Sequence, residues 1–177
     1  MLCYERADAL HKKEAEVRAI EVTDGNSLCE YLKGFWELIW NHKMFGYVYD
    51  IYSDDIKVIR ENGIVIEGIQ AVKQELLNLN AAFPDLRVDI AEIFAMKKGA
   101  GYEIWMRYYF TGTNTAYSVY GAPSGLKMQG DKAINQSMYR VENIDGEWLI
   151  TSEFTGRPCE YIRAICTGDN SFGHVQF

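Results

Sequence analysis

The sequence predicts one α+β domain in which a curved antiparallel or mixed sheet wraps around helices and leaves a cone-shaped pocket. Helical periodicity dominates the first half of the chain, and period-two alternation dominates the second half. Helices gathered before strands are typical of α+β domains, in which the helices cover one face of the sheet. A chain of 177 residues, 48% of them hydrophobic, is large enough to bury one substantial core.

The first half predicts helices at 7–20, 28–41, 44–52 and 69–83 and a hairpin at 56–66. The helix at 7–20 is charged with a thin apolar stripe, so we expect it to be peripheral. The helix at 28–41 carries large apolar residues at helical spacing and is expected to be buried. Asn62-Gly63 supplies the turn of the hairpin, and Pro84 ends the last of these helices.

The second half predicts long strands at 86–91, 102–113, 127–141 and 147–154. The tail from Gly156 is rich in turn residues and is predicted to be an irregular extension over the surface. We therefore divide the chain into an N-terminal helical extension (1–25), a pocket domain (26–155) and a C-terminal extension (156–177).

Charge and composition exclude several classes of function. The net charge is −7 and the lysines and arginines are scattered, so we expect no nucleic-acid partner. No segment approaches the roughly 20 apolar residues of a membrane span, and the mixed, charged start is unlike a secretory signal. The cysteines Cys3, Cys29, Cys159 and Cys166 lack the spacing of a zinc site, so we expect no metal and a cytoplasmic protein with reduced thiols.

Several short strings, in order, resemble a known family. They are Tyr52-Ser53-Asp54-Asp55-Ile56, Gly68 through Ala71-Val72-Lys73, Phe83-Pro84-Asp85-Leu86-Arg87-Val88, Thr111-Gly112-Thr113-Asn114-Thr115, Gly121-Ala122-Pro123-Ser124-Gly125, and Tyr139-Arg140-Val141 leading into Asp145-Gly146. Over about 28–154 the chain resembles the SnoaL-like polyketide cyclases, within the nuclear transport factor 2-like, cystatin-like superfamily.

The resemblance implies an enzyme that closes a ring by an aldol reaction or isomerises its substrate by proton transfer, without metal or cofactor. An acidic residue on the last strand acts as acid and base in such cyclases, and this position falls on Glu153. The partner position, two residues before the aromatic-Arg pair, falls on Ser137. A carboxylate in an apolar pocket is suited to removing a proton beside a carbonyl group.

Strand alternation predicts which of these residues share a face of the sheet, but it does not decide which face lines the pocket. Asn135, Ser137 and Tyr139 share one face of their strand, and Thr151 and Glu153 share one face of theirs. We place Ser137 opposite Glu153 and expect Asn135, Tyr139 and Thr151 to contact the ligand. The opposite choice, with Ile134, Met138, Trp148 and Ile150 facing inward, fits the pattern as well.

The helices supply aromatic candidates for the pocket wall. Trp36, Trp40 and Tyr47 are positioned to line it, and they would suit a small hydrophobic or polyketide-like ligand. Aromatics at the same spacing also fit a plain core. Tyr102, Trp105, Tyr108 and Tyr109 share a long strand, and those that point outward predict a homodimer surface.

Three functional hypotheses follow. The first is a cofactor-independent cyclase or isomerase. The second is a ligand-binding domain without catalysis, motivated by Ser137 and Asn114, which stand where the family often has histidine. The third is a homodimeric assembly domain whose pocket is filled by side chains.

Overall fold

The computed structural model describes residues 3–130 and 132–169. Its helical elements are α1 (Cys3–Arg18), α2 (Gly25–Trp36), a π-helical turn η1 (Glu37–Asn41), a 3-10 turn η2 (Phe45–Tyr47), α3 (Val48–Ile51), α4 (Ile69–Ala82) and α5 (Cys159–Thr167). Its strands are β1 (Tyr52–Arg60), β2 (Val65–Glu67), β3 (Arg87–Lys98), β4 (Gly101–Thr113), β5 (Lys127–Met128), β6 (Ile134–Ile144) and β7 (Glu147–Gly156).

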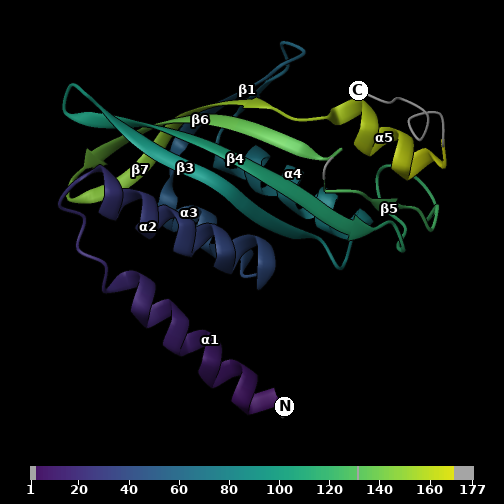
Figure 1. The fold of residues 1–177 in the computed structure, drawn as a ribbon, viewed down its shortest axis with the longest axis horizontal. Coiled ribbons are helices and arrows are strands. Elements are labelled where there is room, and N and C mark those ends of the chain that lie inside the picture. The colour runs from purple at the N-terminus through teal and green to yellow at the C-terminus, as the bar shows by residue number, and fades with distance from the viewer. Residues whose placement is uncertain (1–2, 131, 170–177) are drawn as a thin grey trace.

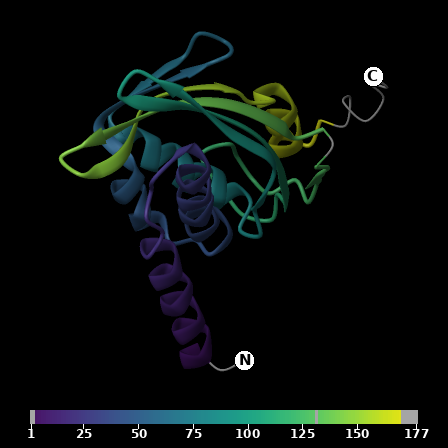
Figure 2. The ribbon, with the colours of Figure 1, turned by 60° about the vertical axis from the view of Figure 1, so that its left-hand side comes forward.

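The strands of the described residues form one mixed sheet. Six of them follow the order β2-β1-β7-β6-β4-β3, and β5 pairs with β4 off this path. β1 runs parallel to β7, whereas the other pairs are antiparallel. The sheet bends over α2, α3 and α4, which lie along one of its faces (Figures 1 and 2). This architecture confirms the predicted α+β fold with helices on one side of a curved sheet.

Helix α2 forms the centre of the helical layer. Asp24 caps its N-terminus, because the Asp24 carboxylate accepts from the Ser27 amide at 2.8 Å and the Ser27 hydroxyl accepts from the Asp24 amide at 2.9 Å. Leu28, Leu32 and Phe35 on its inner face are fully buried. The capped start and the apolar face together fix this helix against the sheet.

Helix α1 projects away from the rest of the molecule (Figures 1 and 2). Its C-terminal half makes the attachment: Lys13 pairs with Glu37, Val17 is buried, and Arg18 pairs with Asp50 at 2.8 Å. A Cβ on Gly34 would lie 2.5 Å from a Val17 methyl carbon, so only glycine allows α2 to approach α1 so closely.

Two predicted elements differ in detail. The helix predicted at 44–52 is two short turns, η2 and α3, and β1 already begins at Tyr52. The strand predicted at 127–141 is divided into β5 and β6. In the first place a run of apolar and polar residues fits a helix or a strand equally well. In the second a turn intervenes, in which the Lys132 and Ala133 amides donate to the Gln129 carbonyl.

The prediction of an irregular C-terminal extension was wrong for 159–167. These residues form α5, whose buried face includes Tyr161, Ile162, Ile165 and Cys166. Gly168 ends the helix in the left-handed conformation at φ 76°. The helix was missed because the turn residues around it dominate the composition of the tail, although its apolar residues recur at helical spacing. Residues 170–177 of the predicted extension lie outside the described residues.

Candidate functional site

A small cavity, which we call the inner cavity, lies between the sheet and the helices. Its volume is about 30 Å³, room for about two water molecules. Aromatic side chains form much of its wall: Trp36, Trp40, Tyr52, Tyr108 and Tyr139. Two acids and two arginines complete a polar side: Arg60, Glu75, Glu153 and Arg157.

The strand register explains why Glu153 faces this cavity. Tyr139 pairs with Glu153 and Ser137 with Thr155, so the predicted pairing of Ser137 with Glu153 was two residues out of register. The register shifts between Arg140 and Val141, because β7 contains the extra residue Thr151. This bulge lets both Ile150 and Glu153 lie on the inner face, although strict alternation would place them on opposite faces. Of the two choices considered from the sequence, the one that turns Ile150 inward holds before the bulge in β7, and the one that turns Glu153 inward holds after it.

Glu153 is 6% exposed and is surrounded by donors. Tyr52 Oη donates to Glu153 Oε2 at 3.4 Å, and Arg60 Nη1 lies 3.4 Å from Glu153 Oε1. The Thr155 hydroxyl donates to the same Oε1. Since all three partners donate, the carboxylate acts as an acceptor, which is the form that can take up a proton.

A chain of hydroxyl groups stands behind Glu153. Thr155 Oγ1 is 2.8 Å from Ser137 Oγ, which is 3.3 Å from Tyr108 Oη. Thr155 has one proton and directs it at Glu153, so Ser137 donates to Thr155 and Tyr108 donates to Ser137. This chain of hydrogen bonds, which ends on Glu153, fixes the orientation of the Glu153 carboxylate.

The cavity tyrosines remain protonated donors. Burial, and second the charge of Glu153, raises the pKa of Tyr52 and of Tyr139 well above the ordinary phenol value. Burial also raises the pKa of Tyr108. These hydroxyls can therefore donate hydrogen bonds to a negatively charged oxygen without losing their own protons.

Two buried arginines and two acids form an alternating network. Arg60, 5% exposed, contacts Glu153 through Nη1 and Glu75 through Nη2. Arg157, 9% exposed, lies 3.5 Å from Glu75. Burial alone would lower the pKa of Arg157, but the negative charge of Glu75, and less strongly that of Glu153, raises it above its usual value. The four charges balance, which makes their burial possible.

The structure brings together half of the residues predicted for the site. Trp36, Trp40, Tyr139 and Glu153 line the inner cavity. Ser137 and Asn135 are buried behind this wall: Ser137 reaches Glu153 through Thr155, and the Asn135 amide donates to the Ala133 carbonyl.

Tyr47 and Thr151 lie away from the cavity lining. Tyr47 packs edge-on against Phe35, with ring centroids 5.8 Å apart. Thr151 is the extra residue of the bulge, and its hydroxyl donates to the Arg140 carbonyl at 3.4 Å. Its side chain is turned aside by the bulge, which the sequence pattern did not reveal.

Sequence reasoning missed Arg60, Glu75 and Arg157. Arg60 continues the buried alternation of Ile56 and Val58, and Arg157 lies two residues beyond Thr155 on the same face. Glu75 interrupts the apolar stripe of α4. A charged residue at a position where the pattern predicts a buried apolar one could have identified each of them from the sequence.

Asn114, where the family often has histidine, has a structural role here. Its amide donates to the Ala82 carbonyl at 2.9 Å, and its oxygen accepts from the Ser124 amide at 2.7 Å. Asn114 thus ties the loop between β4 and β5 to the end of α4.

The opposite face of the sheet carries a row of apolar side chains in register across five strands. The row, which we call the outer row, consists of Phe94, Trp105, Met138, Phe154 and Ile59, each opposite the next. Phe94 and Trp105 stack with ring centroids 6.5 Å apart. Trp105 is 41% and Phe154 47% exposed. Of the four aromatics considered for an outer surface, Trp105 is exposed and Tyr108 is buried.

Within residues 3–130 and 132–169, no group of three His, Cys, Asp or Glu side chains could hold a metal ion. Over the same residues, no helix is both long enough and apolar enough to span a membrane.

Comparisons with known proteins find likeness at the level of structure. No family model matches the sequence, and no curated protein matches it. A protein named for SnoaL-like polyketide cyclases, from Jannaschia sp. CCS1, is 12% identical, with a TM-score of 0.54 over 75% of this chain and 89% of that chain. A ketosteroid isomerase-like protein from Erwinia carotovora atroseptica is 16% identical, with a TM-score of 0.55 over 73% and 92%.

An NTF2-like protein with a cystatin-like fold, from Novosphingobium aromaticivorans, is 9% identical, with a TM-score of 0.54 over 84% of this chain and 86% of that chain. Such identities establish the fold, and chemistry has to be argued from the site. The chain has the nuclear transport factor 2-like, cystatin-like fold of the SnoaL-like polyketide cyclases, as its sequence motifs predicted.

Proposed function

We propose that the protein is a cofactor-independent isomerase or cyclase that moves a proton on a small carbonyl compound in the inner cavity. The observation that carries this proposal is Glu153, a buried carboxylate that accepts from Tyr52, Arg60 and Thr155 beside an aromatic wall. A solved relative in fold is a ketosteroid isomerase-like protein, and another is named for polyketide cyclases.

Glu153 takes a proton from the carbon beside the carbonyl group, and the electron pair moves onto the carbonyl oxygen. The Tyr139 hydroxyl on the cavity wall donates a hydrogen bond to that oxygen, while Tyr52 keeps its hydrogen bond to Glu153. Glu153 then returns the proton to another carbon, which completes an isomerisation. Alternatively, the enolate carbon attacks a second carbonyl, which closes a ring, and the proton on Glu153 passes to the oxygen of that carbonyl to give a hydroxyl group. Ser137 is a positioning residue that acts through Thr155.

Substrate has to displace side chains from this cavity, because about 30 Å³ holds little more than water. The Arg60–Glu153 contact at 3.4 Å is the natural one to open. Its loss would free Glu153 for the substrate while Arg60 keeps Glu75 as a partner. A small hydrophobic or polyketide-like ligand with a carbonyl group fits the aromatic wall.

The test uses 3-cyclohexen-1-one, whose isomerisation to the conjugated 2-cyclohexen-1-one is followed by absorbance. In D₂O, NMR reports exchange of its protons beside the carbonyl group. Glu153→Gln should lower either rate at least about 100-fold, the usual contribution of a general base. Glu92→Gln, on exposed strand β3, is the matched control and should retain full activity. Equal rates in wild type and Glu153→Gln would remove Glu153 from the chemistry.

A ligand-binding domain without catalysis is the second candidate. It is favoured by the arginine contacts that already occupy the acids of the cavity. If wild-type protein neither isomerises 3-cyclohexen-1-one nor exchanges its protons, yet the ketone shifts the NMR signals of Trp36 and Trp40, this candidate is preferred.

We also propose that two copies of the chain pair through the outer row. Exposed apolar side chains aligned across five strands are typical of an interface, and this sheet face can meet its own copy about a two-fold axis. Sedimentation equilibrium should give a dimer for wild type and a monomer for Trp105→Glu. A wild-type monomer at high micromolar concentration would exclude this pairing.

A further inference from the structure

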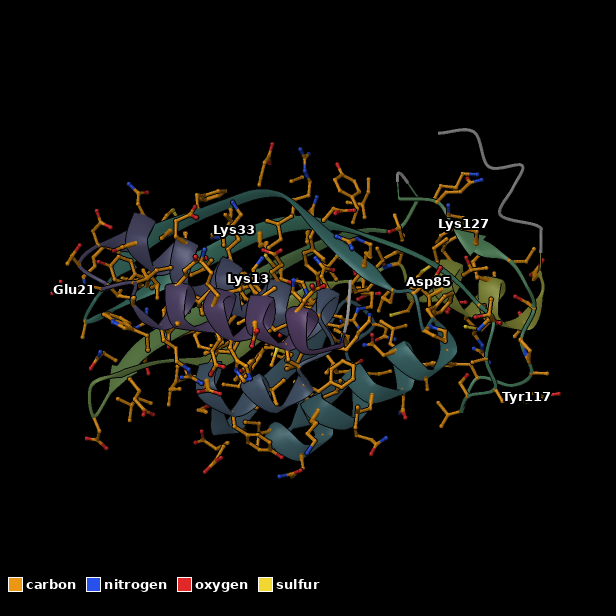
Figure 3. The ribbon with its side chains drawn as sticks, turned by 90° about the horizontal axis from the view of Figure 1, so that it is seen from below. Lys13, Glu21, Lys33, Asp85, Tyr117 and Lys127 are labelled. Carbon is orange, nitrogen blue, oxygen red and sulfur yellow. The ribbon has the colours of Figure 1, made fainter. Side chains whose placement is uncertain are left out.

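A second cavity, which we call the outer cavity, lies between α4, α5 and the loop that joins β4 to β5. Its volume is about 490 Å³, within the range of small-molecule sites. The loop, which carries Tyr117, lies beside α5 at one end of the molecule (Figures 1 and 3). Helix α5 belongs to the C-terminal extension, so this cavity exists because the chain continues beyond the sheet.

About half of the outer cavity wall is apolar, and its polar side includes Glu75, Glu160 and Thr167. Leu79 comes from α4, Val119 and Tyr120 from the loop, and Cys159 and Ile162 from α5. Arg163, an exposed residue of α5, lies at its edge. A wall of this kind suits the apolar body of a small organic molecule.

Arg157 lies in the wall that separates the two cavities, since it lines both of them together with Glu75. Its side chain is nine-tenths buried, and its one carboxylate contact within the described residues is Glu75 at 3.5 Å. Arg157 Nε finds no acceptor among the described residues. Glu75 is also held by Arg60 through its other oxygen.

A buried guanidinium with a free donor needs an acceptor. Arginine offers five N–H donors in a planar fork that matches a carboxylate with two parallel hydrogen bonds. A neutral carbonyl group would accept from one donor, whereas a carboxylate can accept from two. The cavity therefore combines a buried arginine, Arg157, with an apolar patch, while Arg163 and Glu160 lie elsewhere in its wall.

We propose that the outer cavity binds small organic monocarboxylates, with the carboxylate on Arg157 and the apolar body against Leu79, Tyr120 and Ile162. The site is separate from Glu153, so it does not depend on proton transfer in the inner cavity. Because Arg157 borders both cavities, a bound acid places its carboxylate at the wall of the inner cavity.

Isothermal titration calorimetry on the full chain tests the anchor, with 4-phenylbutanoate and its neutral amide, 4-phenylbutanamide, as probes. The acid should bind at least tenfold more tightly than the amide. Arg157→Gln should abolish this difference, whereas Arg163→Gln should change the affinity for the acid less than threefold. Glu153→Gln should bind the acid as wild type does, whatever its activity. Equal binding of acid and amide to wild type would overturn the proposal.

Cys159 reports on the site without any substitution, in case Arg157→Gln does not fold. It lines the outer cavity, whereas Cys29 is buried in α2. Saturating 4-phenylbutanoate should slow the alkylation of Cys159 by iodoacetamide at least fivefold, measured by peptide mass spectrometry, and leave the rate at Cys29 unchanged. An acid that binds without protecting Cys159 would bind elsewhere and contradict the proposal.

Discussion

On β6 and β7 several polar side chains lie on the buried inner face of the sheet, while apolar side chains lie on the exposed outer face. On β7 the polar residues Glu153 and Thr155 are buried, while Phe154 between them is half exposed. On β6 Asn135 and Ser137 are buried, while Ile134 is exposed. Burying a polar group costs free energy unless the group has a hydrogen-bond partner, and leaving an aromatic ring exposed gives up the free energy that its burial would contribute. Both features support the two proposals for this protein, a polar site on the inner face and a contact surface on the outer face.

Arg60→Met should have the largest effect, because it leaves the buried Glu153 and the partly buried Glu75 with fewer partners. Breaking one side of a buried charge network typically costs about 3–5 kcal/mol of unfolding free energy. Urea denaturation measures this cost. The double variant Arg60→Met/Glu153→Gln should recover part of the loss. A loss below about 1 kcal/mol in the single variant would show that the inner face does not depend on this pairing.

Thr155→Val should have the next largest effect. It removes the hydroxyl between Ser137 and Glu153 while keeping the shape of the side chain. We expect a loss of about 1–3 kcal/mol of unfolding free energy, the cost of leaving buried polar groups unsatisfied. Thr151→Val is the matched control on the same strand and should cost about 0.5 kcal/mol or less, because its hydroxyl makes one long contact. Equal losses would remove the distinction between the two positions.

Lys43 is a half-buried charge that makes no ion pair with an acid among residues 3–130 and 132–169. Its ammonium donates to Asn80 Oδ1 and the Leu86 carbonyl, and burial lowers the pKa of Lys43 to about 8. The unfolded chain keeps this proton up to the usual lysine value of 10.5. Between these pH values the unfolded state binds more protons, so the contribution of Lys43 makes the protein more stable as pH rises.

Urea denaturation from pH 8 to 10 measures this contribution as a difference between wild type and Lys43→Met. The slope of unfolding free energy against pH should be more positive in wild type, by less than about 1.4 kcal/mol per pH unit, the limit for one proton. Taking the difference removes the shared contributions of tyrosines and cysteines. Identical slopes would mean that the Lys43 ammonium is as well solvated in the folded protein as in the unfolded chain.

Phe154→Ser should have the smallest effect on the fold of one chain. The residue lies next to Thr155 but on the outer face, so we expect a loss of less than about 1 kcal/mol at low protein concentration. If the outer row is a dimer interface, the wild-type midpoint should rise with protein concentration, and this dependence should vanish in the variant. A loss at low concentration as large as that of Thr155→Val would assign Phe154 to the stability of the single chain.

The sequence alone determined the fold and the residue at the centre of the site. Helical spacing and period-two alternation are local properties, so they predicted α2, α4 and the long strands, and ordered motifs pointed to Glu153. The same alternation placed Trp105 on a strand where it could point outward. The amphipathic spacing of α5 was also present, but the turn residues around it outweighed it.

Only the tertiary structure decided which groups meet Glu153. Arg60, Glu75 and Arg157 come from β1, α4 and the segment after β7, which are distant in sequence, and their contacts depend on the parallel pairing of β1 with β7. The bulge at Thr151 shifted the register by one residue, and a shift of one residue turns each side chain to the other face. The period-two pattern of the sequence does not reveal such a shift, because the hydrogen bonds that fix the register are made with neighbouring strands.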